Sequence, residues 1–583
     1  MIVPMKKITV IVQAKDTQEA LESLRTLGVV HVEHQVSPAG DKVSSLKAEE
    51  MRFSRVVAVL ADIAEQKQPQ ENEKDTAEKI LTIIKEKEYL YENILRRQRH
   101  IDQWQEWGDF DPALIEDFKN KNLLVRLARI HHKRLKEVPK GVIVHTLFKK
   151  GAVAYCALIS QEEIDLPFET LALPKTSLAS MLTQQDADKQ RIQRIESALN
   201  DYAHYKQALV DYTKRLSARL QFQETSAGMG KFETLSYLRG YIPHDVAPSL
   251  EESAQRQQWA LLIEEPELDD NVPTLIRNPR WVQIIKPVFD IIKALPGYKE
   301  VDISLWFLLF FSVFFGILIG DAGYGMVVFA LTLFLHARLK KSLKDTRIFT
   351  LTYILSTSAI IWGVLTGTFF GQAWLAQHLQ PLLPQLNNSR TVQALCFLIG
   401  AVHLSIAHVW RGLMKFPHLK FLSEAGWICL LWTGFFLART LILDEAFPNV
   451  AKGLLISGAI LIVLFTNPSK QIVKSFGSGL QDLLLNAVNS FTDVVSYIRL
   501  FAVGVATVAV ADAFNQMAAT AGGSGVVGGL ITVVILLLGH TLNIALCAMA
   551  VLVHGVRLNV LEFSSHLNME WSGMPYDPFK NKE

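Results

Sequence analysis

Residues 304–337 read SLWFLLFFSVFFGILIGDAGYGMVVFALTLFLHA, and this apolar stretch decides the architecture. As one helix it would be about 51 Å long at about 1.5 Å per residue, whereas the hydrocarbon core of a bilayer is about 30 Å thick. Gly320, Asp321 and Gly323 interrupt the stretch half-way along. We therefore expect two short membrane-spanning helices with Asp321 at the turn between them.

Further apolar stretches predict six more spans, which makes eight in all. They lie at about 349–370, 392–410, 424–441, 451–465, 480–519 and 527–560. The last two would be roughly 50 to 60 Å long as helices, so they must tilt steeply or project beyond the bilayer.

Charge is distributed unevenly along the chain. Residues 1–303 hold 87 charged side chains and residues 304–560 hold only 23. Such an asymmetry is expected when one half of a chain lies in lipid. The formal net charge is only +2, which argues against a dedicated nucleic-acid-binding protein. The sequence therefore predicts an α+β soluble half followed by an all-α membrane bundle.

The soluble half begins with a strand, helix and strand. Ile8–Val12 alternates as a strand does, a helix starts at Asp16 and closes at Gly28, and residues 29–32 predict the next strand. Short strands are also predicted at 141–148, 152–159 and 236–243, the last ended by Pro243. We expect two small α/β lobes.

Two coiled-coil segments, at about 44–107 and 186–222, are expected to join these lobes as a long antiparallel pair. The first seam comprises Ile80, Ile84, Lys87, Tyr91, Ile94, Gln98 and Ile101. The second comprises Ile192, Ile195, Leu199, Tyr202, Tyr205, Leu209, Tyr212, Leu216 and Leu220. Two lobes joined by a long helical pair form a dumbbell, a shape suited to a rigid mechanical support.

Catalytic motifs are missing from the sequence. There is no G-x-x-x-x-G-K-[ST], G-x-G-x-x-G, H-E-x-x-H or G-x-S-x-G, and residues 228–231 (GMGK) lack the first glycine and the Ser/Thr of a phosphate loop. The four cysteines form no CxxC pair and are interpreted as packing residues, and His31 and His34 as surface residues. We expect no nucleotide, cofactor or metal site in this chain.

Lysine and arginine in the loops predict the orientation. With the soluble half and both termini cytoplasmic, the inner loops carry Arg338, Lys340, Lys341, Lys344, Arg347, Arg411, Lys415, Lys420, Lys470 and Lys474. The outer loops then carry only Arg390, Arg439 and Lys452. This distribution of lysine and arginine requires two spans in residues 304–337, since a single first span would place every later loop on the opposite side.

The last two spans carry polar stripes at steps of three and four residues. On the seventh span these are Asp482, Asn486, Asn489, Asp493, Ser496 and Arg499, and on the eighth His540, Asn543, Cys547, Ala550, His554 and Arg557. Together they are predicted to line one aqueous half-path. Asp321, His403 and Glu424 are possible accessory members.

Insertion of an arginine at the middle of a membrane costs about 2.5 to 3.5 kcal/mol of free energy. We therefore expect Arg499 to have a functional role. The alternative is that Asp493 or another buried acid neutralises it structurally. For His540 and His554, and for His403, His408 and Glu424, the alternative is hydrogen bonding between helices. The small residues Ala502, Gly504, Ala506, Ala509 and Ala511 favour close approach of another helix or packing within this chain.

The chain resembles the a/I subunit of rotary V-type (A/V-type) ATPases over essentially its whole length. The resemblance rests on an ordered series of segments: Lys6–Val10, Gly240–Pro243, Phe315–Gly325, Gly363–Gly371, Glu424–Trp427, Ser496–Phe501 and His554–Phe563, which adds Glu562 to the candidate ion-translocation residues. The chain departs from many relatives at Tyr324, and from some at Thr507 and Cys547, where they carry ionisable groups.

The resemblance implies a non-catalytic stator that faces a rotating proteolipid c/K ring with Arg499. Peripheral stalk E/G-type subunits would bind the soluble dumbbell, and the rest of the V1/A1 ATPase would make or hydrolyse ATP while H⁺ or Na⁺ crosses the cell membrane. The expected domains are a stalk-binding arm at 1–300, an ion-translocation domain at 301–566 and a cytoplasmic tail at 567–583.

Two other classes of protein compete with this interpretation. A secondary transporter would use Arg499 to bind an anionic substrate, but the membrane half shows no matching pair of interrupted spans. A membrane-anchored coiled-coil scaffold would need no charge at mid-bilayer. Neither class explains both halves of the chain.

Overall fold

The structure is a computed structural model of the 583-residue chain and describes residues 1–60, 73–166, 168–340, 343, 345–372, 381–467, 472–522 and 525–581. Lys341, Lys344 and Lys470 of the predicted inner loops lie outside the described residues, as does part of the first coiled-coil segment. The chain divides into two compact units: Met1–Val10, Val29–His31 and Gly240–Pro578 form one, and Ile11–Gly28, Val32–Arg239 and Phe579–Glu583 form the other. The boundaries predicted at about 300 and 567 stay predictions.

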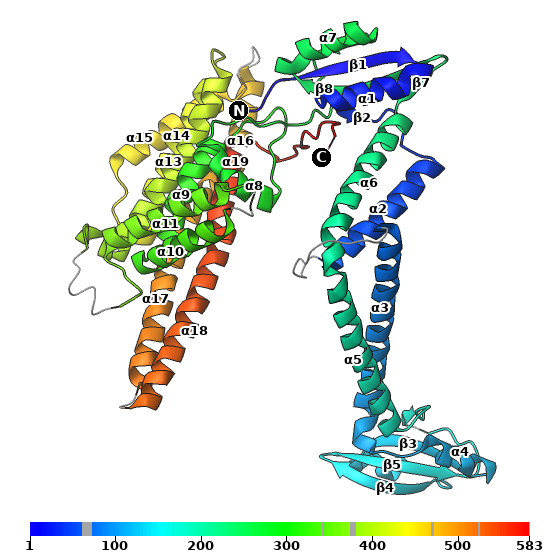
Figure 1. The fold of residues 1–583 in the computed structure, drawn as a ribbon. Helices are drawn as coiled ribbons and strands as arrows, with labels where there is room; N and C mark the ends of the chain where they lie inside the picture. The colour runs from blue at the N-terminus through cyan, green and yellow to red at the C-terminus, as the bar shows by residue number, and fades with distance from the viewer. Residues whose placement is uncertain are drawn as a thin grey trace. The chain divides into compact units, whose positions relative to one another are not determined.

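The helical arm consists of two antiparallel pairs, α3 with α5 and α2 with α6 (Figure 1). The bounds are α2 Asp41–Leu60, α3 Glu73–Trp104, α5 Leu178–Asp201 and α6 Lys206–Ala227. Most of the predicted apolar positions of both seams are buried here, including Ile80, Ile84, Ile101, Ile192, Ile195, Leu199, Leu209 and Leu216. Burial of these positions is what holds the long helices together.

The first seam is wrong at its centre. Tyr91 is 46% exposed, and its neighbour Leu90 is buried in its place. Lys87 lies at the flank of the interface, where its Nζ is 2.8 Å from a carboxylate oxygen of Glu196 and 5.8 Å from the Tyr91 ring centroid. A flanking ion pair of this kind keeps a lysine and its aromatic neighbour at the surface while the leucine packs inward.

One end of the arm carries a four-stranded antiparallel sheet of order β4-β5-β3-β6. The bounds are α4 Pro112–Asn120, β3 Leu124–His131, β4 Ile143–Lys150, β5 Val153–Ser160 and β6 Thr170–Leu171. β4 and β5 lie within two residues of their predicted positions, whereas β3 was not predicted. Lys150 donates to Glu106 at 2.7 Å, and this hydrogen bond lowers the pKa of Glu106 at the end of the arm.

The second sheet has the order β2-β8-β1-β9, with β7 paired to β8. Its elements are β1 Met5–Gln13, α1 Thr17–Leu27, β2 His31–Glu33, β7 Gly230–Phe232, β8 Leu235–Pro243, α7 Ala247–Gln257 and β9 Ala260–Glu264. The predicted strand, helix and strand at the start are confirmed. Gly28 ends α1 with φ of +63°, a left-handed conformation that glycine adopts without strain.

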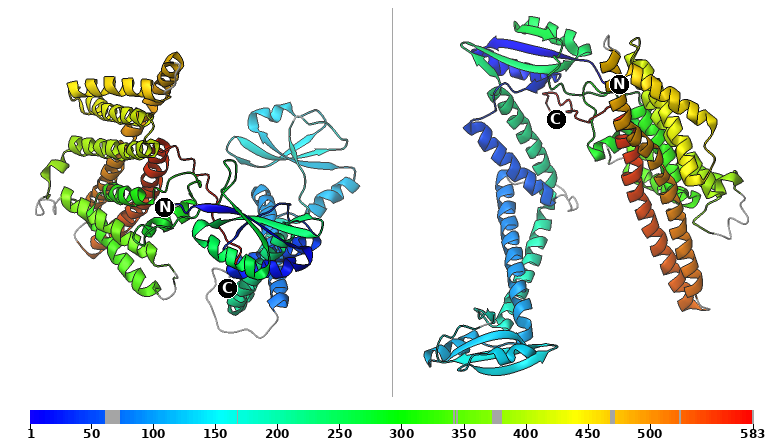
Figure 2. Two further views of the ribbon diagram at one scale, coloured as in Figure 1. Left: turned by 90° about the horizontal axis from the view of Figure 1, so that it is seen from above. Right: turned by 180° about the vertical axis from the view of Figure 1, so that it is seen from behind.

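The remaining helices are largely apolar. Their bounds are α8 Lys286–Ile292, α9 Ser304–Ile319, α10 Ala322–Leu339, α11 Arg347–Thr366, α13 Ser389–Lys415, α14 Phe421–Leu443, α15 Asn449–Phe465, α16 Ile472–Ser496, α17 Ile498–Ala521, α18 Val526–Ala550 and α19 Ser564–His566. Two π-helical segments, Val551–Gly555 and Leu558–Phe563, connect α18 to α19. α17 and α18 run side by side (Figures 1 and 2).

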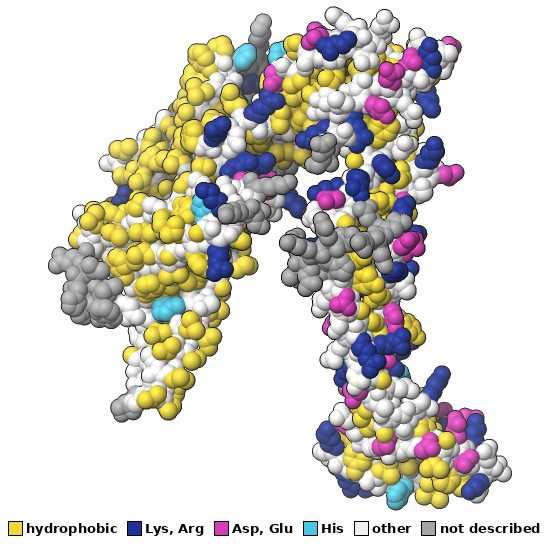
Figure 3. Space-filling model, in the orientation of Figure 1, with side chains coloured by type: hydrophobic (Ala, Val, Ile, Leu, Met, Phe, Trp, Pro, Cys, Tyr) yellow, Lys and Arg dark blue, Asp and Glu magenta, His cyan; other side chains and the backbone are white. Residues whose placement is uncertain are grey.

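Six spans in the described part of the chain are long and apolar enough to cross a membrane. α9 and α15, with 16 and 17 residues, are shorter, about 24 to 26 Å at 1.5 Å per residue. The predicted turn at Asp321 is confirmed, since it lies between α9 and α10. The predicted total of eight spans is thus shown for six, and the two shorter helices stay a prediction. Hydrophobic side chains dominate the visible face of these helices, and charged ones gather over the arm (Figure 3).

Candidate functional site

Arg499 lies at the first turn of α17, in the middle of the 43-residue span Gly479–Ala521. The helix is interrupted at Tyr497, whose ring is fully buried, and the Nε–H of Arg499 donates to the Ser496 carbonyl oxygen at 3.0 Å. Its side chain remains 23% exposed. The guanidinium is therefore tethered on one side and open on the other.

Glu562 is the acid that neutralises Arg499. The Nη2 group of Arg499 donates to Glu562 Oε1, and the Nε atom of Arg557 lies 3.4 Å from the same oxygen. The second oxygen, Oε2, is buried and has no hydrogen-bond partner among the described residues. Arg557 and Glu562 are five residues apart, which a π-helical turn brings to the same face. Glu562 thus joins two cations and keeps one acceptor unused.

Asp493 pairs with a histidine instead. Its Oδ2 atom lies 3.1 Å from His566 Nε2, and His566 Nδ1 lies 2.8 Å from His408 Nε2. His408 Nδ1 continues the series to Glu424 Oε2 at 2.6 Å. The four side chains come from α16, α19, α13 and α14. Sequence reasoning did not single out His566, and for His408 it left open both a functional role and hydrogen bonding between helices.

Two cations hold the far end of this series. Lys415 donates to Glu424 Oε1, and Arg411 Nη2 lies 3.3 Å from the same oxygen. Arg411 also donates to the His566 carbonyl oxygen at 2.9 Å. Glu424 is only 2% exposed, so its charge is stabilised by these contacts rather than by water.

A second polar cluster lies on the other side of Arg499 along α17 and α18. The Tyr324 hydroxyl lies 2.7 Å from His540 Nδ1 and accepts a hydrogen bond from the Asn543 amide at 3.0 Å. Asn543 also donates to the Thr507 carbonyl oxygen, and the Cys547 thiol donates to the Thr507 hydroxyl at 3.5 Å. Tyr324, Thr507 and Cys547 are therefore joined through Asn543 in one hydrogen-bonded cluster.

The side chains of Asp321 and His403 are both held by contacts within the chain. Asp321 is fully buried, and its two carboxylate oxygens accept the backbone N–H groups of Tyr324 at 3.1 Å and Gly371 at 3.0 Å, so it caps α10. His403 Nδ1 bonds the Tyr497 hydroxyl at 2.8 Å, and its ring stacks on Phe310 and Phe563. The contact of His403 with Tyr497 fits the alternative considered for it, hydrogen bonding between helices.

The other candidates make local contacts. Asn486 donates to Asp482 at 2.7 Å, Asn489 to the Leu485 carbonyl at 3.5 Å and Ser496 to the Asp493 carbonyl at 2.7 Å. Asn486 and Asn489 are exposed, as is Arg557 with a side chain 53% exposed. His554 keeps a buried Nδ1 without a hydrogen-bond partner among the described residues.

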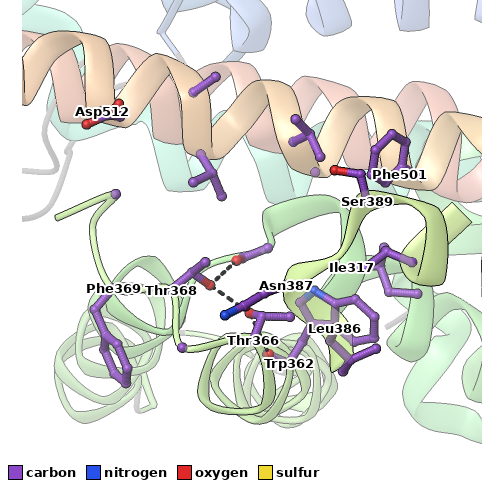
Figure 4. A pocket seen from close by; sticks show the side chains of 18 of the residues that line it. Ile317, Trp362, Thr366, Thr368, Phe369, Leu386, Asn387, Ser389, Phe501 and Asp512 are labelled. Carbon is purple, nitrogen blue, oxygen red and sulfur yellow. Dashed lines mark hydrogen bonds between the residues drawn. The ribbon is translucent and has the colours of Figure 1, made fainter. Parts of the chain in front are cut away.

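A cavity of about 430 Å³ lies beside α17 (Figure 4). On α17 its lining runs from Leu500, next to Arg499, to Asp512, a rise of about 18 Å at 1.5 Å per residue. Thr366, Thr368 and Asn387 contribute polar atoms to the opposite wall, and the Thr366 and Thr368 hydroxyls are hydrogen-bonded at 2.9 Å. These polar atoms lie in an otherwise largely apolar lining that includes Trp362, Phe369 and Leu386.

The chain matches no family model. It is similar over its whole length to V-type ATP synthase subunit I of Borreliella burgdorferi, with 31% identity over 614 aligned positions that cover 100% of this chain and 99% of the relative. The chain belongs to the V-type ATP synthase subunit I family. V-type ATP synthase subunit I 1 of Treponema pallidum is 28% identical, with complete coverage of both chains.

More distant members extend the subunit I family to archaea. A-type ATP synthase subunit I of Methanocaldococcus jannaschii is 27% identical over 67% of this chain and 64% of its own length. A crystal structure of the cytoplasmic N-terminal domain of subunit I, homolog of subunit a, of V-ATPase is 15% identical and covers 44% of this chain and 99% of its own, with a TM-score of 0.23. A score this low carries no weight for the fold.

The resemblance found in the sequence is confirmed. As a subunit I, the protein is a multi-pass membrane stator subunit of a V/A-type ATP synthase, and it is a non-catalytic member of a complex that includes partner subunits.

Proposed function

We propose that this subunit I presents Arg499 to the carboxylates of a rotating proteolipid ring and supplies the two half-channels by which H⁺ or Na⁺ reaches and leaves the ring. The observation that carries the proposal is the Arg499 guanidinium, which lies mid-way along a long apolar span and is still partly exposed. A guanidinium is always charged, so a ring carboxylate beside it is driven to the anion and releases its ion. A fixed positive charge also blocks direct passage, and rotation becomes obligatory.

The contact between Arg499 and Glu562 supports this role because Arg499 can exchange Glu562 for a ring carboxylate. Glu562 neutralises Arg499 through a single oxygen and also has Arg557 within reach. An arriving ring carboxylate would take over Arg499 while Arg557 retains Glu562. The desolvation cost of an unpaired charge is thereby avoided at each step.

The half-channels follow the two polar regions. The one on the cytoplasmic side reaches Arg499 by way of Asp493, the last acid of the α16 stripe. The outer one uses the cavity along α17 and the cluster around Tyr324, since both lead from Arg499 toward the opposite end of the span. His540, Asn543, His554, Arg557 and Ser496 line these paths or hold their walls.

The arm is proposed to bind peripheral stalk subunits of the E/G type. Long helical pairs with small sheets resist torque along their axis, and the described part of the chain carries no nucleotide-binding motif. We propose residues 1–300 as this stalk-binding part, 301–566 as the ion-translocating part and 567–583 as a cytoplasmic tail.

Purification of the chain in mild detergent tests the function. A proteolipid ring, two stalk subunits and the ATPase head should come with it, and the reconstituted complex should take up H⁺ or Na⁺ when ATP is added. Recovery of the chain without a proteolipid, or ATP-independent uptake of an organic anion, would contradict the proposal.

The orientation is tested with single cysteines. Both Lys340 and Gln385 are exposed in the described structure, and we place Lys340 in the cytoplasm and Gln385 outside. On intact cells an impermeant thiol reagent should label Gln385→Cys and leave Lys340→Cys unlabelled. The parent chain serves as control because three of its four cysteines are buried. Labelling of Lys340→Cys alone would show that the chain has the opposite orientation in the membrane.

A further inference from the structure

Asp493, His566, His408 and Glu424 form a continuous series of hydrogen bonds, which we call the relay. Its three links measure 3.1, 2.8 and 2.6 Å. The interior of the relay is dry: His408 is 3% exposed, His566 8% and Glu424 2%. The Asp493 side chain at one end is 26% exposed, and Glu424 at the other end reaches the surface through Lys415, which contacts it and is 34% exposed.

Counting protons shows what the relay holds. Each of the three links needs one hydrogen, and two neutral imidazoles supply only two. With both carboxylates ionised, one link would lack its hydrogen, and a buried hydrogen bond left unmade is costly. The relay is therefore complete only with one additional proton, which resides on one carboxylate or on the imidazole pair.

We propose that the relay carries protons between the cytoplasm and the neighbourhood of Arg499, so that the ion moved by this subunit is H⁺ and not Na⁺. In one state Asp493 is protonated and donates to His566 Nε2, His566 Nδ1–H donates to His408 Nε2, and His408 Nδ1–H donates to Glu424. Shifting each hydrogen across its link leaves Asp493 ionised and Glu424 protonated. All three hydrogen bonds persist, both imidazoles end neutral, and one proton has moved the length of the relay.

The charges around the relay favour this exchange. Lys415 and Arg411 face Glu424 and stabilise a negative charge at this end of the relay, and Trp427 lies parallel to the His408 ring. Arg499, six residues from Asp493, pairs with Glu562, and Arg557 faces the same acid. A sodium ion cannot use this path because it would have to break the links and displace protonated nitrogens.

The first experiment uses the unaltered complex and rests on the proposed function. Inside-out vesicles supplied with ATP should acidify in sodium-free medium, and a protonophore should abolish the gradient. Protonophore-resistant uptake of radioactive sodium would overturn the relay while leaving the proposed function intact. ATP-independent uptake of an organic anion by the same vesicles would instead refute the proposed function. This measurement decides the question even if no variant assembles.

The second experiment breaks the relay. His408→Gln and His566→Gln keep polar groups of similar length but cannot accept a proton on one atom and release one from another. We expect acidification per assembled complex to fall at least tenfold, and imidazole in the bath to restore part of it in His408→Ala and His566→Ala, whose short side chains leave room for the ring. His418→Gln is the matched control, since His418 is exposed in the loop between α13 and α14. Normal acidification by both relay variants, or a loss in the alanine variants that imidazole does not restore, would overturn the relay.

Discussion

Arg499→Ala is expected to abolish ATP-driven ion uptake, by at least a hundredfold per assembled complex. Without the guanidinium a ring carboxylate has no reason to ionise at this position, so the ion is carried past rather than released. Assembly should be largely preserved, because Glu562 still has Arg557 at 3.4 Å and the buried arginine no longer has to be desolvated. Complex abundance and ATP-driven uptake in reconstituted vesicles measure the two effects separately.

Two further substitutions serve as controls for this prediction. Arg499→Lys should rescue poorly, since an ammonium lacks the planar donor fork and loses its proton more readily in a site of low dielectric constant. Arg557→Ala should reduce uptake only partly, because its side chain is 53% exposed and water already screens its charge. Normal uptake by an assembled Arg499→Ala complex would refute the mechanism.

The sequence could reveal Arg499 because its signal is local: one cation stands in the middle of a long apolar span. The partner of Arg499 has no local signal. Glu562 lies 63 residues further along, and the steps of three and four that organise the eighth span fail where the π turns bring Arg557 and Glu562, five residues apart, together. The alternative considered for Arg499 was a contact with Asp493 or another buried acid, and the acid that contacts it in the structure is Glu562 and not Asp493.

The relay and strand β3 were missed for a related reason. The relay joins side chains of four helices, and its links to His566 span 158 residues from His408 and 73 residues from Asp493, so no periodicity connects them. Strand β3 carries Arg126 and Arg129, which weaken its apolar pattern. Arg126 bonds Glu163 at 3.0 Å and Arg129 bonds the Gln103 carbonyl at 2.9 Å, so tertiary contacts satisfy both charges. Asp321 was predicted at the right turn, but its two oxygens cap a helix there.

The close approach of α17 to α9 accounts for one of the small residues near Arg499. A Cβ atom on Gly504 would lie 2.4 Å from the Ile317 carbonyl oxygen, and one on Gly320 would lie 3.3 Å from the Gly504 carbonyl oxygen. The Thr507 hydroxyl, one turn later, lies 3.3 Å from the Leu318 carbonyl oxygen. Packing within the chain therefore explains Gly504, and it fixes the position of Arg499 five residues earlier on the same helix.

Gly504→Ala is expected to reduce ion uptake per assembled complex several-fold, and Gly504→Val to prevent stable assembly. The obstructing atom belongs to backbone and cannot rotate away, so α17 must shift, at a cost of about 1 to 3 kcal/mol for a single added methyl group. Gly453→Ala in α15 is the matched control, because nothing lies within 4 Å of its Cβ position. Thermal stability of the purified complex should fall with Gly504→Ala and stay unchanged with Gly453→Ala. If the Gly504→Ala complex pumped and melted like the control, the backbone contact would not set the position of Arg499.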